Sequence, residues 1–225
     1  MVKIFLIICL KNIFMGKITK NDIICMLKNP GTYLVLLATF SIYSVHVSMS
    51  YFTPYFTRVI GTTVVFSGVL AVARQGLKLV SSPFGGWYGD KIGSNCKVMR
   101  FAAVIITILT ATVIFLPKGT SVAILITVVM LLALMDGMNL SLEYSTTRES
   151  LIPKKYLGTV IGFCSIISPD LFQETFFGHL LDTYGKRGYN YIFSYTIGMG
   201  LVVIIVLTII VIRFQHKKTE VKFEN

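Results

Sequence analysis

The sequence predicts an all-α integral membrane protein with six transmembrane helices, arranged as a 3+3 inverted repeat. One observation is composition: 54% of the 225 residues are hydrophobic and 14% are charged, whereas soluble globular proteins carry about 25% charged residues. Another is a series of uninterrupted apolar runs of about 20 residues, the length that crosses a bilayer as a helix. The third is a glycine and aspartate pattern that recurs after the second and the fifth run.

The predicted elements follow one another with short connections. Residues 1–30 are expected to form a cytoplasmic segment with an amphipathic helix that ends before Pro30. Residues 31–213 are expected to form the membrane bundle, and residues 214–225 a cytoplasmic tail. Pro169 falls within the fifth span, where it removes a helical hydrogen bond and is expected to kink the helix. The six spans are placed at about residues 32–55, 62–84, 99–117, 121–143, 157–181 and 189–212.

The distribution of basic residues predicts the orientation of the chain. With the N-terminus inside, 15 of the 21 Lys and Arg residues fall on the cytoplasmic side, four in outer loops and two within spans. Cytoplasmic loops of membrane proteins carry such an excess, so both termini are expected on the cytoplasmic side of the cell membrane. Orientation and attraction to anionic lipids thereby explain the net charge of +11, and no nucleic-acid partner is expected.

A Gly-x3-Asp-x2-Gly pattern occurs twice in the chain. Gly86, Asp90 and Gly93 follow the second span on the predicted inside, and residues 178–185 carry the same pattern after the fifth span on the outside. Because glycine permits tight turns, both stretches are expected to be turns between helices. The two copies sit at equivalent positions in opposite orientation, which predicts that spans one to three and four to six are inverted repeats.

Ionisable residues within membrane spans cost about 2.5–3.5 kcal/mol each and normally face a cavity or a partner. They occur here in spans one, two, four and five, so the charge-free third and sixth spans are expected to face lipid. Five of them are expected near mid-membrane, whereas Glu143 and Glu174 lie nearer the interfaces, where water could solvate them. The five are His46, Arg74, Lys78, Asp136 and Asp170.

Four of these residues are candidates for binding a substrate. Arg74 and Lys78 share one helix face at i, i+4 and need counter-charges, which an anionic ligand would supply. A small organic anion is therefore the expected substrate. Alternatively, Asp136 and Asp170 neutralise both cations and leave a neutral site, or the charges form only a buried ion-pair network that holds helices together. The substrate-binding candidates are Arg74, Lys78, His46 and Asp136.

Two acidic residues of the fifth span are candidates for proton coupling. Asp170 lies beside Pro169, and burial favours the protonated form of a carboxyl group unless a cation is close. Glu174 follows one helical turn later and is the second candidate. His46 remains open to two interpretations, because its imidazole could be a hydrogen-bonded packing group or part of a proton relay.

The sequence lacks the motifs of the common enzyme classes. It contains no G-x4-G-K-[ST] phosphate loop, no HExxH and no GxSxG. The four cysteines have neither metal-ligand nor CxxC spacing. We therefore expect no enzyme activity, no cofactor and no metal site.

The stretch GGWYGDKIG at residues 85–93 resembles the cytoplasmic motif of the major facilitator superfamily (MFS), G-x-L-[AG]-D-[RK]-x-G-[RK]-[RK]. Tyr88 replaces the usual leucine, and Ser94 and Asn95 stand where basic residues usually follow. The stretch RESLIPKKYLGTVIGFCSIISPDLF, which begins at Arg148, is similar to the region of the tenth and eleventh helices in bacterial members. The residues that match the motif are Gly86, Gly89, Asp90, Lys91 and Gly93.

The resemblance covers about residues 30–213 and implies the C-terminal six-helix half of a twelve-helix carrier. It implies a secondary transporter half that moves a small solute, with the N-terminal half missing or on a separate chain. Its partners would be a small-molecule substrate, protons and the lipid bilayer. It also implies that Asp90 contacts a cation, for which Arg148 is the candidate here, and that this contact gates the carrier. The alternative function is a stand-alone six-helix channel or scaffold.

Overall fold

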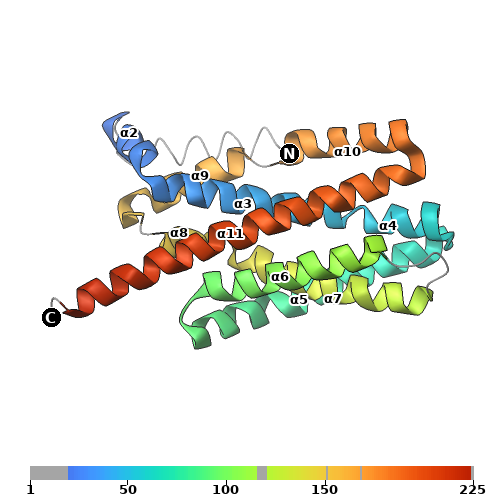
Figure 1. Ribbon diagram of the computed structural model, residues 1–225, viewed down its shortest axis with the longest axis horizontal. Helices are drawn as coiled ribbons and strands as arrows, with labels where there is room; N and C mark the ends of the chain where they lie inside the picture. Colours follow the sequence, from blue (N-terminus) through green and yellow to red (C-terminus); the bar gives the residue numbers. More distant parts are fainter. Residues whose placement is uncertain (1–19, 116–120, 151, 168, 224–225) are drawn as a thin grey trace.

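The computed structural model describes residues 20–115, 121–150, 152–167 and 169–223, and these residues form helices without any strand. The helices lie side by side and run back and forth along the long axis of the bundle (Figure 1). The reversals from α5 to α6 and from α10 to α11 are short connections, as the sequence predicts. The long elements are α3 (Pro30–Met49), α5 (Val64–Ile92), α6 (Asn95–Phe115), α7 (Val122–Leu142), α10 (Asp170–Tyr184) and α11 (Gly188–Phe223).

Shorter elements connect or extend the long ones. The helix α2 (Lys20–Lys28) lies in the segment where an amphipathic helix is expected, and it ends before Pro30. After α3, the chain continues through two short helical pieces, four more follow α7, and one follows α10. These pieces are α4 (Phe52–Tyr55), the π-helical η1 (Phe56–Ile60), the 3-10 helix η2 (Glu143–Ser145), α8 (Thr146–Glu149), η3 (Lys154–Tyr156), α9 (Leu157–Ile166) and η4 (Gly185–Arg187).

Five helical stretches in the described residues are long and apolar enough to cross a membrane, one fewer than the six predicted spans. The difference lies in the predicted fifth span, which is not a continuous helix. It is divided into α9 and α10 on either side of Pro169, because proline has no N–H group to donate along the helix. The 3+3 inverted repeat therefore stays a prediction. The five stretches are Pro30–Ile60, Val64–Ile92, Asn95–Phe115, Val122–Glu149 and Phe172–Arg213.

Both Gly-x3-Asp-x2-Gly stretches are helix ends, so the prediction that they are turns is wrong. α5 continues through the first stretch to Ile92, and only Gly93 leaves the helix, with φ at 71°. In the second stretch α10 continues to Tyr184, and Gly185 has φ at 54°. Glycine commonly ends a helix in this left-handed region. At 29 residues α5 is about 43 Å long, so its last turns extend beyond a hydrocarbon core of about 30 Å.

Local sequence explains where two of the long helices begin. Asn29 precedes Pro30, and its side chain accepts a hydrogen bond from the Gly31 N–H at 2.8 Å. Thr63 does the same for the Phe66 N–H at 3.2 Å at the start of α5. Side chains of this kind satisfy the free N–H groups of a first turn, and proline suits the first helical position because its missing N–H is not needed there.

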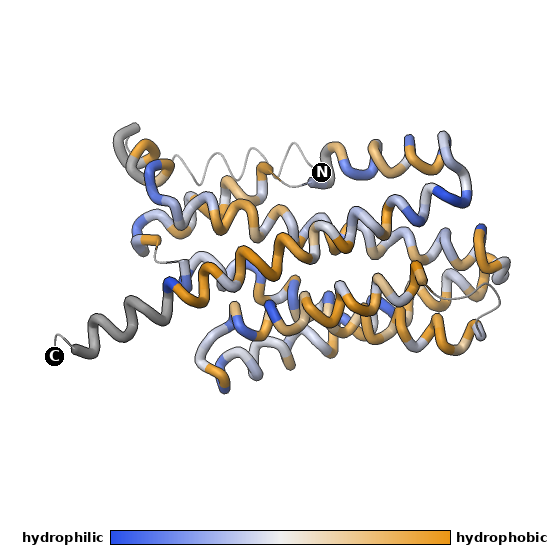
Figure 2. Tube along the Cα trace, in the orientation of Figure 1, coloured by the Kyte–Doolittle hydropathy of each residue, from blue (hydrophilic) through white to orange (hydrophobic). Residues whose placement is uncertain are grey.

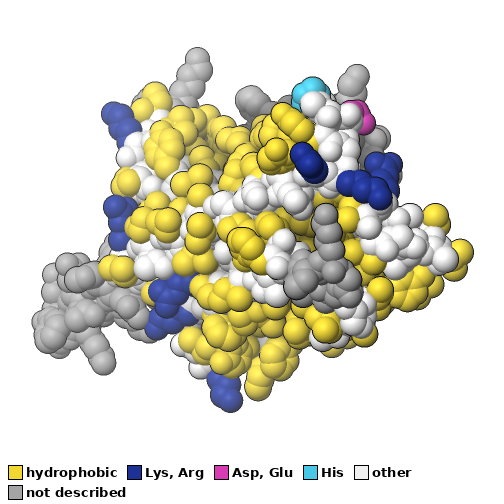
Figure 3. All heavy atoms as spheres, turned by 45° about the vertical axis from the view of Figure 1, so that its right-hand side comes forward, with side chains coloured by type: hydrophobic (Ala, Val, Ile, Leu, Met, Phe, Trp, Pro, Cys, Tyr) yellow, Lys and Arg dark blue, Asp and Glu magenta, His cyan; other side chains and the backbone are white. Residues whose placement is uncertain are grey.

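Apolar residues lie on the outside of the bundle as well as in its core (Figure 2). α5 is the most exposed span: 22% of its most apolar window is buried, against 61% for the span that contains α3. Val65 and Leu79 are each 78% exposed on α5. The space-filling view shows a broad hydrophobic surface with basic side chains towards its margins (Figure 3). Such a surface suits lipid or another membrane-embedded chain.

Candidate functional site

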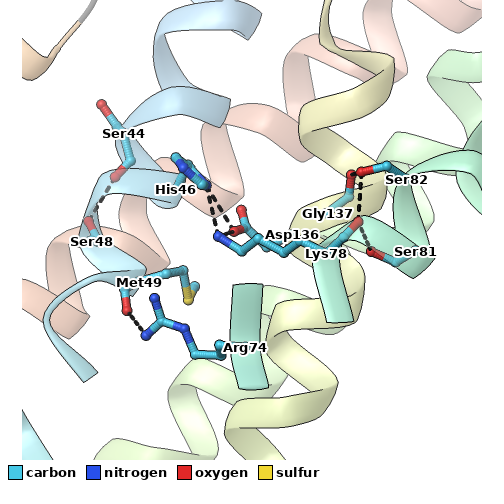
Figure 4. A network of polar contacts seen from close by, with 10 residues as sticks. All are labelled: Ser44, His46, Ser48, Met49, Arg74, Lys78, Ser81, Ser82, Asp136 and Gly137. Carbon is cyan, nitrogen blue, oxygen red and sulfur yellow. Dashed lines mark hydrogen bonds and ion pairs between the residues drawn. The ribbon is translucent and has the colours of Figure 1, made fainter. Parts of the chain in front are cut away.

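A buried carboxylate at Asp136 brings three helices together. α7 carries Asp136, which is 1% exposed, and its Oδ2 lies 2.7 Å from Lys78 Nζ of α5 and 2.9 Å from His46 Nδ1 of α3 (Figure 4). Lys78 is the central residue of the 29-residue helix α5. Three of the four predicted substrate-binding residues therefore meet at one point, near the middle of the three membrane-spanning stretches that carry them, Pro30–Ile60, Val64–Ile92 and Val122–Glu149.

The imidazole of His46 has two possible hydrogen-bond partners for a single nitrogen. Its Nδ1 lies 2.9 Å from Asp136 Oδ2 and 3.3 Å from Lys78 Nζ. Nδ1 donates to the carboxylate when it carries a hydrogen and accepts from the ammonium group when it does not. The arrangement can therefore exist in two hydrogen-bonding states that differ only in the position of protons, which suits a group that takes part in proton transfer.

Arg74, the fourth predicted residue, lies apart from the triad and lacks an acidic partner. Its Nη1 donates to the backbone oxygen of Met49 at 2.5 Å, and its Nε has no hydrogen-bond partner. The side chain is 6% exposed. In the part of the chain that the structure describes, both ion pairs involve Asp136. One buried positive charge, one helical turn from Lys78, is thus left without an ion pair, although Asp136 lies within electrostatic range of it.

A narrow crevice runs between Arg74 and the triad. It leaves no room even for a water molecule, whereas pockets that hold small-molecule ligands measure about 300–1,000 Å³. The walls combine apolar side chains with three ionisable ones, as expected for a site that orients a polar solute. The lining residues are Met49, Phe52, Arg74, Lys78, Val129, Leu132, Ala133 and Asp136.

The two predicted proton-coupling residues do not join this buried site. Asp170 is the first residue of α10, and its side chain lies outside the described part of the structure. Glu174 is exposed, and its backbone oxygen accepts a hydrogen bond of 3.5 Å from the Tyr51 hydroxyl. Their role in coupling stays a prediction.

The residues of the MFS-like motif lie at the end of α5 and beyond it. Gly89 is buried, and a Cβ at this position would overlap the side chain of Asn95. Gly86 has open space around it, and Gly93 is exposed. Lys91 Nζ lies 5.3 Å from the centre of the Trp87 ring, within the range of a cation–π interaction. Among the motif glycines described, Gly89 allows close packing and Gly93 ends the helix.

The predicted contact between Asp90 and Arg148 is not formed. Both side chains are exposed, and neither belongs to an ion pair within the described residues. The neighbouring residue Glu149 instead makes the contact between α8 and the start of α6. Its Oε1 accepts from the backbone N–H groups of Asn95 at 2.6 Å and Cys96 at 3.3 Å, and its Oε2 accepts from Ser94 Oγ at 2.6 Å.

Sequence reasoning missed Glu149 because it looked for a cation–carboxylate pair. A carboxylate that caps a helix N-terminus needs no cation, since the free N–H groups and the helix dipole stabilise its charge. The signal that could have revealed it is the Ser94–Asn95 pair that begins α6, which lacks an acidic residue in its first turn. A distant acidic residue is then a reasonable partner.

The location of Glu143 also differs from the prediction. The sequence places it close enough to the membrane interface to be solvated, but the side chain is 2% exposed and its Oε1 has no hydrogen-bond partner. After Glu143, the elements α8 and α9 fold back against α3, which also contacts η2 (Figure 1). Such folding back of the following segment is not visible in an apolar run.

Comparison with known proteins supports a transport role. The sequence profile described as "MFS_1 like family" matches residues 30–224. The inner membrane protein YqcE of Escherichia coli K12 is 26% identical over 169 residues, which cover 72% of this chain and 40% of YqcE. The inner membrane protein YihN of the same organism is 22% identical over 211 residues, which cover 91% of this chain and 50% of YihN.

The chain thus spans about half the length of the curated relatives it matches. The family profile matches nearly all of the membrane region. The apolar helices of the multi-pass bundle lead to the same assignment. This multi-pass membrane protein belongs to the MFS_1 like family, a family of membrane transporters.

Proposed function

We propose that this chain is one half of a secondary transporter that moves a small organic anion by alternating access. The observation that supports the anion is Arg74, a buried guanidinium that forms no ion pair among the described residues. A buried charge is costly unless a counter-charge meets it. A carboxylate or phosphate on the substrate would supply that charge and match the planar geometry of arginine.

The charges around the crevice support an anion rather than a neutral solute. Asp136 neutralises the charge of Lys78, which it contacts at 2.7 Å. His46 adds a further positive charge when it is protonated. The net charge of these four groups at mid-membrane is therefore one positive charge, or two when His46 is protonated. Arg74 is the cation left to bind the substrate. Lys78, His46 and Asp136 then position Arg74 and respond to substrate binding.

The proposal includes a second set of helices as a partner. The chain covers 40% of YqcE and 50% of YihN, and the crevice is smaller than an ordinary ligand pocket. We propose that an N-terminal six-helix half completes the cavity, in the same chain or on another one, and that both termini are cytoplasmic. The exposed side chains of Asp90, Lys91 and Arg148 are then available to contact that half. Asp170 and Glu174 remain our candidates for proton coupling.

The test is uptake into proteoliposomes. This chain is co-expressed with the first half of YqcE, purified, and assayed with a panel of labelled carboxylates, phosphates and neutral solutes. We expect saturable uptake of an anion that needs both halves. Arg74→Gln should weaken its apparent affinity about 10–100-fold, the equivalent of losing a charge-assisted hydrogen bond of about 1.5–3 kcal/mol.

Two controls separate the parts of this proposal. Arg74→Lys keeps the charge and should lose less affinity than Arg74→Gln, and Arg187→Gln removes an exposed arginine and should have no effect. Unchanged affinity in Arg74→Gln would show that the arginine is structural. Saturable uptake by this chain alone would contradict the half-transporter, and non-saturable flux would favour a channel.

A further inference from the structure

Glu143 is a buried carboxyl group that no interaction described so far explains. It is the first residue of η2, immediately after α7, and it is 2% exposed. Its Oε1 has no hydrogen-bond partner, and it belongs to neither of the ion pairs in the described residues. A buried carboxylate without a partner is far less stable than the neutral acid.

The contact between α3 and α7 determines what lies opposite Glu143. The two helices run in opposite directions (Figure 1), and they meet where His46 contacts Asp136 at 2.9 Å. Seven residues are two helical turns and return to the same face. Seven residues back from His46 is Thr39, and seven residues on from Asp136 is Glu143, so these two residues face each other.

The neighbouring residues agree with this register. The Cys164 thiol of α9 lies close to Thr39 and within electrostatic range of Glu143, so both residues border the same space. Midway between the two pairs, Asn139 of α7 lies at the level of Tyr43 of α3. We name the row formed by Thr39, Tyr43, His46, Asp136, Asn139 and Glu143 the α3–α7 polar seam.

Three buried oxygens of this seam have no hydrogen-bond partner: Thr39 Oγ1, Asn139 Oδ1 and Glu143 Oε1. The residues are 4%, 4% and 2% exposed, respectively. The amide oxygen and the carboxylate oxygen can only accept hydrogen bonds, and they lie one turn apart on the same face of α7. The Thr39 hydroxyl can donate its single hydrogen to only one of these two acceptors, so the group is short of one donor.

We propose that Glu143 is a proton-binding site, occupied in this conformation, that lies at the opposite end of the α3–α7 polar seam from Asp136. The carboxylate takes up one proton from water and becomes a neutral carboxylic acid, whose O–H is the missing donor for the neighbouring acceptors. The distance between the two carboxyl groups along α7 is about 10 Å. The polar side chains between them provide intermediate hydrogen-bonding positions.

No cation in the described residues competes for this role. Arg148 of α8 is exposed, and Glu149 is held by the first turn of α6. Arg100 of α6 is partly buried and forms no ion pair. The other titratable groups that face the seam are Cys164 of α9, Tyr43 and His46 of α3, Lys78 of α5 and Asp136 of α7. Of these groups, Lys78 and His46 both contact Asp136.

Infrared difference spectroscopy of the purified chain across a pH series tests the site. We expect a C=O band from a protonated carboxyl group that is present at neutral pH and disappears reversibly at alkaline pH. Glu143→Gln should remove this band, whereas Glu174→Gln, which alters an exposed carboxyl, should leave it. Asn139→Leu keeps the carboxyl but removes an acceptor, so it should shift the frequency of the band.

Thermal unfolding provides a second readout. If the folded state holds a proton that the unfolded state releases, the stability of the wild type falls as pH rises from about 4.3, the ordinary pKa of glutamate, to the pH at which the folded state loses the proton. Glu143→Gln, which imitates the neutral acid, should lose this dependence. A spectrum without a band that depends on Glu143 would overturn the proposal, and so would a band that responds to sodium at constant pH. These measurements use this chain alone, so their outcome is independent of whether the half-transporter moves an anion.

Discussion

The Asp136 carboxylate receives contacts from two helices through one oxygen atom. Lys78 Nζ and His46 Nδ1 lie 2.7 Å and 2.9 Å from Oδ2, and Asp136 is 1% exposed. In such a place, a charge loses its hydration and depends on its partners. The sequence left two interpretations of these residues open: an ion-pair network that holds helices together, and a transport site. The two are compatible, because the same contacts can hold helices together and respond to a ligand.

The interdependence of Lys78 and Asp136 leads to a prediction about stability. Lys78→Leu leaves the carboxylate with His46 alone, and Asp136→Leu leaves a buried ammonium group. Each change should destabilise the chain by about 3–5 kcal/mol, the cost of removing one partner of a buried pair. The double variant should be less destabilised than the sum of the two, because it leaves no unpaired charge. Thermal unfolding in detergent measures all three variants.

A double-mutant cycle analyses the result. A coupling energy of about 2 kcal/mol or more would show that the two residues act as a pair. Strictly additive losses would contradict the direct contact. Arg148→Leu, which removes an exposed cation, serves as the control and should change stability by less than about 0.5 kcal/mol.

Close packing between α5 and α7 positions Lys78 next to Asp136. Gly137 lies directly beside Asp136, and a Cβ at this position would lie 2.9 Å from Lys78 Cα and overlap Ser81 Oγ. Gly85 is a second close approach, where a Cβ would lie 3.2 Å from Met138 Cα. Small residues at a helix interface let the backbones approach in a membrane, so these glycines determine the distance across which Lys78 reaches the carboxylate.

This packing predicts opposite effects for two glycine substitutions. Gly137→Ala should destabilise the chain by about 1–3 kcal/mol, because the new methyl group has to push α5 away from α7. Gly86→Ala introduces the same methyl group into open space on the same helix pair, so it should be neutral or stabilise by up to about 1 kcal/mol. Thermal unfolding of both variants checks the contrast, and equal losses would mean that the α5–α7 contact is looser than described.

The first turn of α6 depends on a side chain from another element. Glu149 of α8 accepts hydrogen bonds from two backbone N–H groups and one hydroxyl there. Glu149→Ala should cost roughly 2 kcal/mol, as expected for loss of a charged cap. Hydrogen exchange at the amides of Asn95 and Cys96 should accelerate, whereas Arg148→Gln should leave it unchanged. Unaltered exchange in Glu149→Ala would show that the cap is not formed in solution.

At the scale of the whole molecule, both described ends lie at the same end of the bundle. α2 and the end of α11 lie on the left in Figure 1, together with α8 and the connection between α5 and α6. The opposite end contains the connection between η1 and α5 and the reversal from α10 to α11. The described chain therefore runs along the bundle an even number of times, and its fifth passage consists of the two shorter helices α9 and α10.

Reporter fusions test this topology. Green fluorescent protein fused at either end of the chain should fluoresce, because the excess of basic residues predicts a cytoplasmic location for both ends. Alkaline phosphatase is active only outside the cytoplasm, so it should be active when inserted after Phe115 and inactive when fused at either end. Activity at one end and fluorescence at the other would mean that the chain crosses the membrane an odd number of times.

Much of this architecture could be predicted from the sequence, because it depends on local properties. The length and hydropathy of each apolar run suffice for a helix in a bilayer, where every backbone group has to be satisfied within its own segment. Asn29 with Pro30 and Thr63 identify helix starts by the same local logic. The choice of His46, Lys78 and Asp136 as a group rested on the cost of placing charge in a membrane, and the structure brings these three residues into contact.

The sequence by itself therefore determined the membrane class, the helical elements and which charged residues need a partner or a cavity within the bundle. Only the tertiary structure decided which charges meet: Lys78 engages Asp136 while Arg74 does not, Glu149 replaces Arg148 as the contact at the α5–α6 connection, and Glu143 is buried rather than solvated. The physical reason is that helix formation is a property of a segment, whereas burial and pairing depend on which helices pack side by side and in what register.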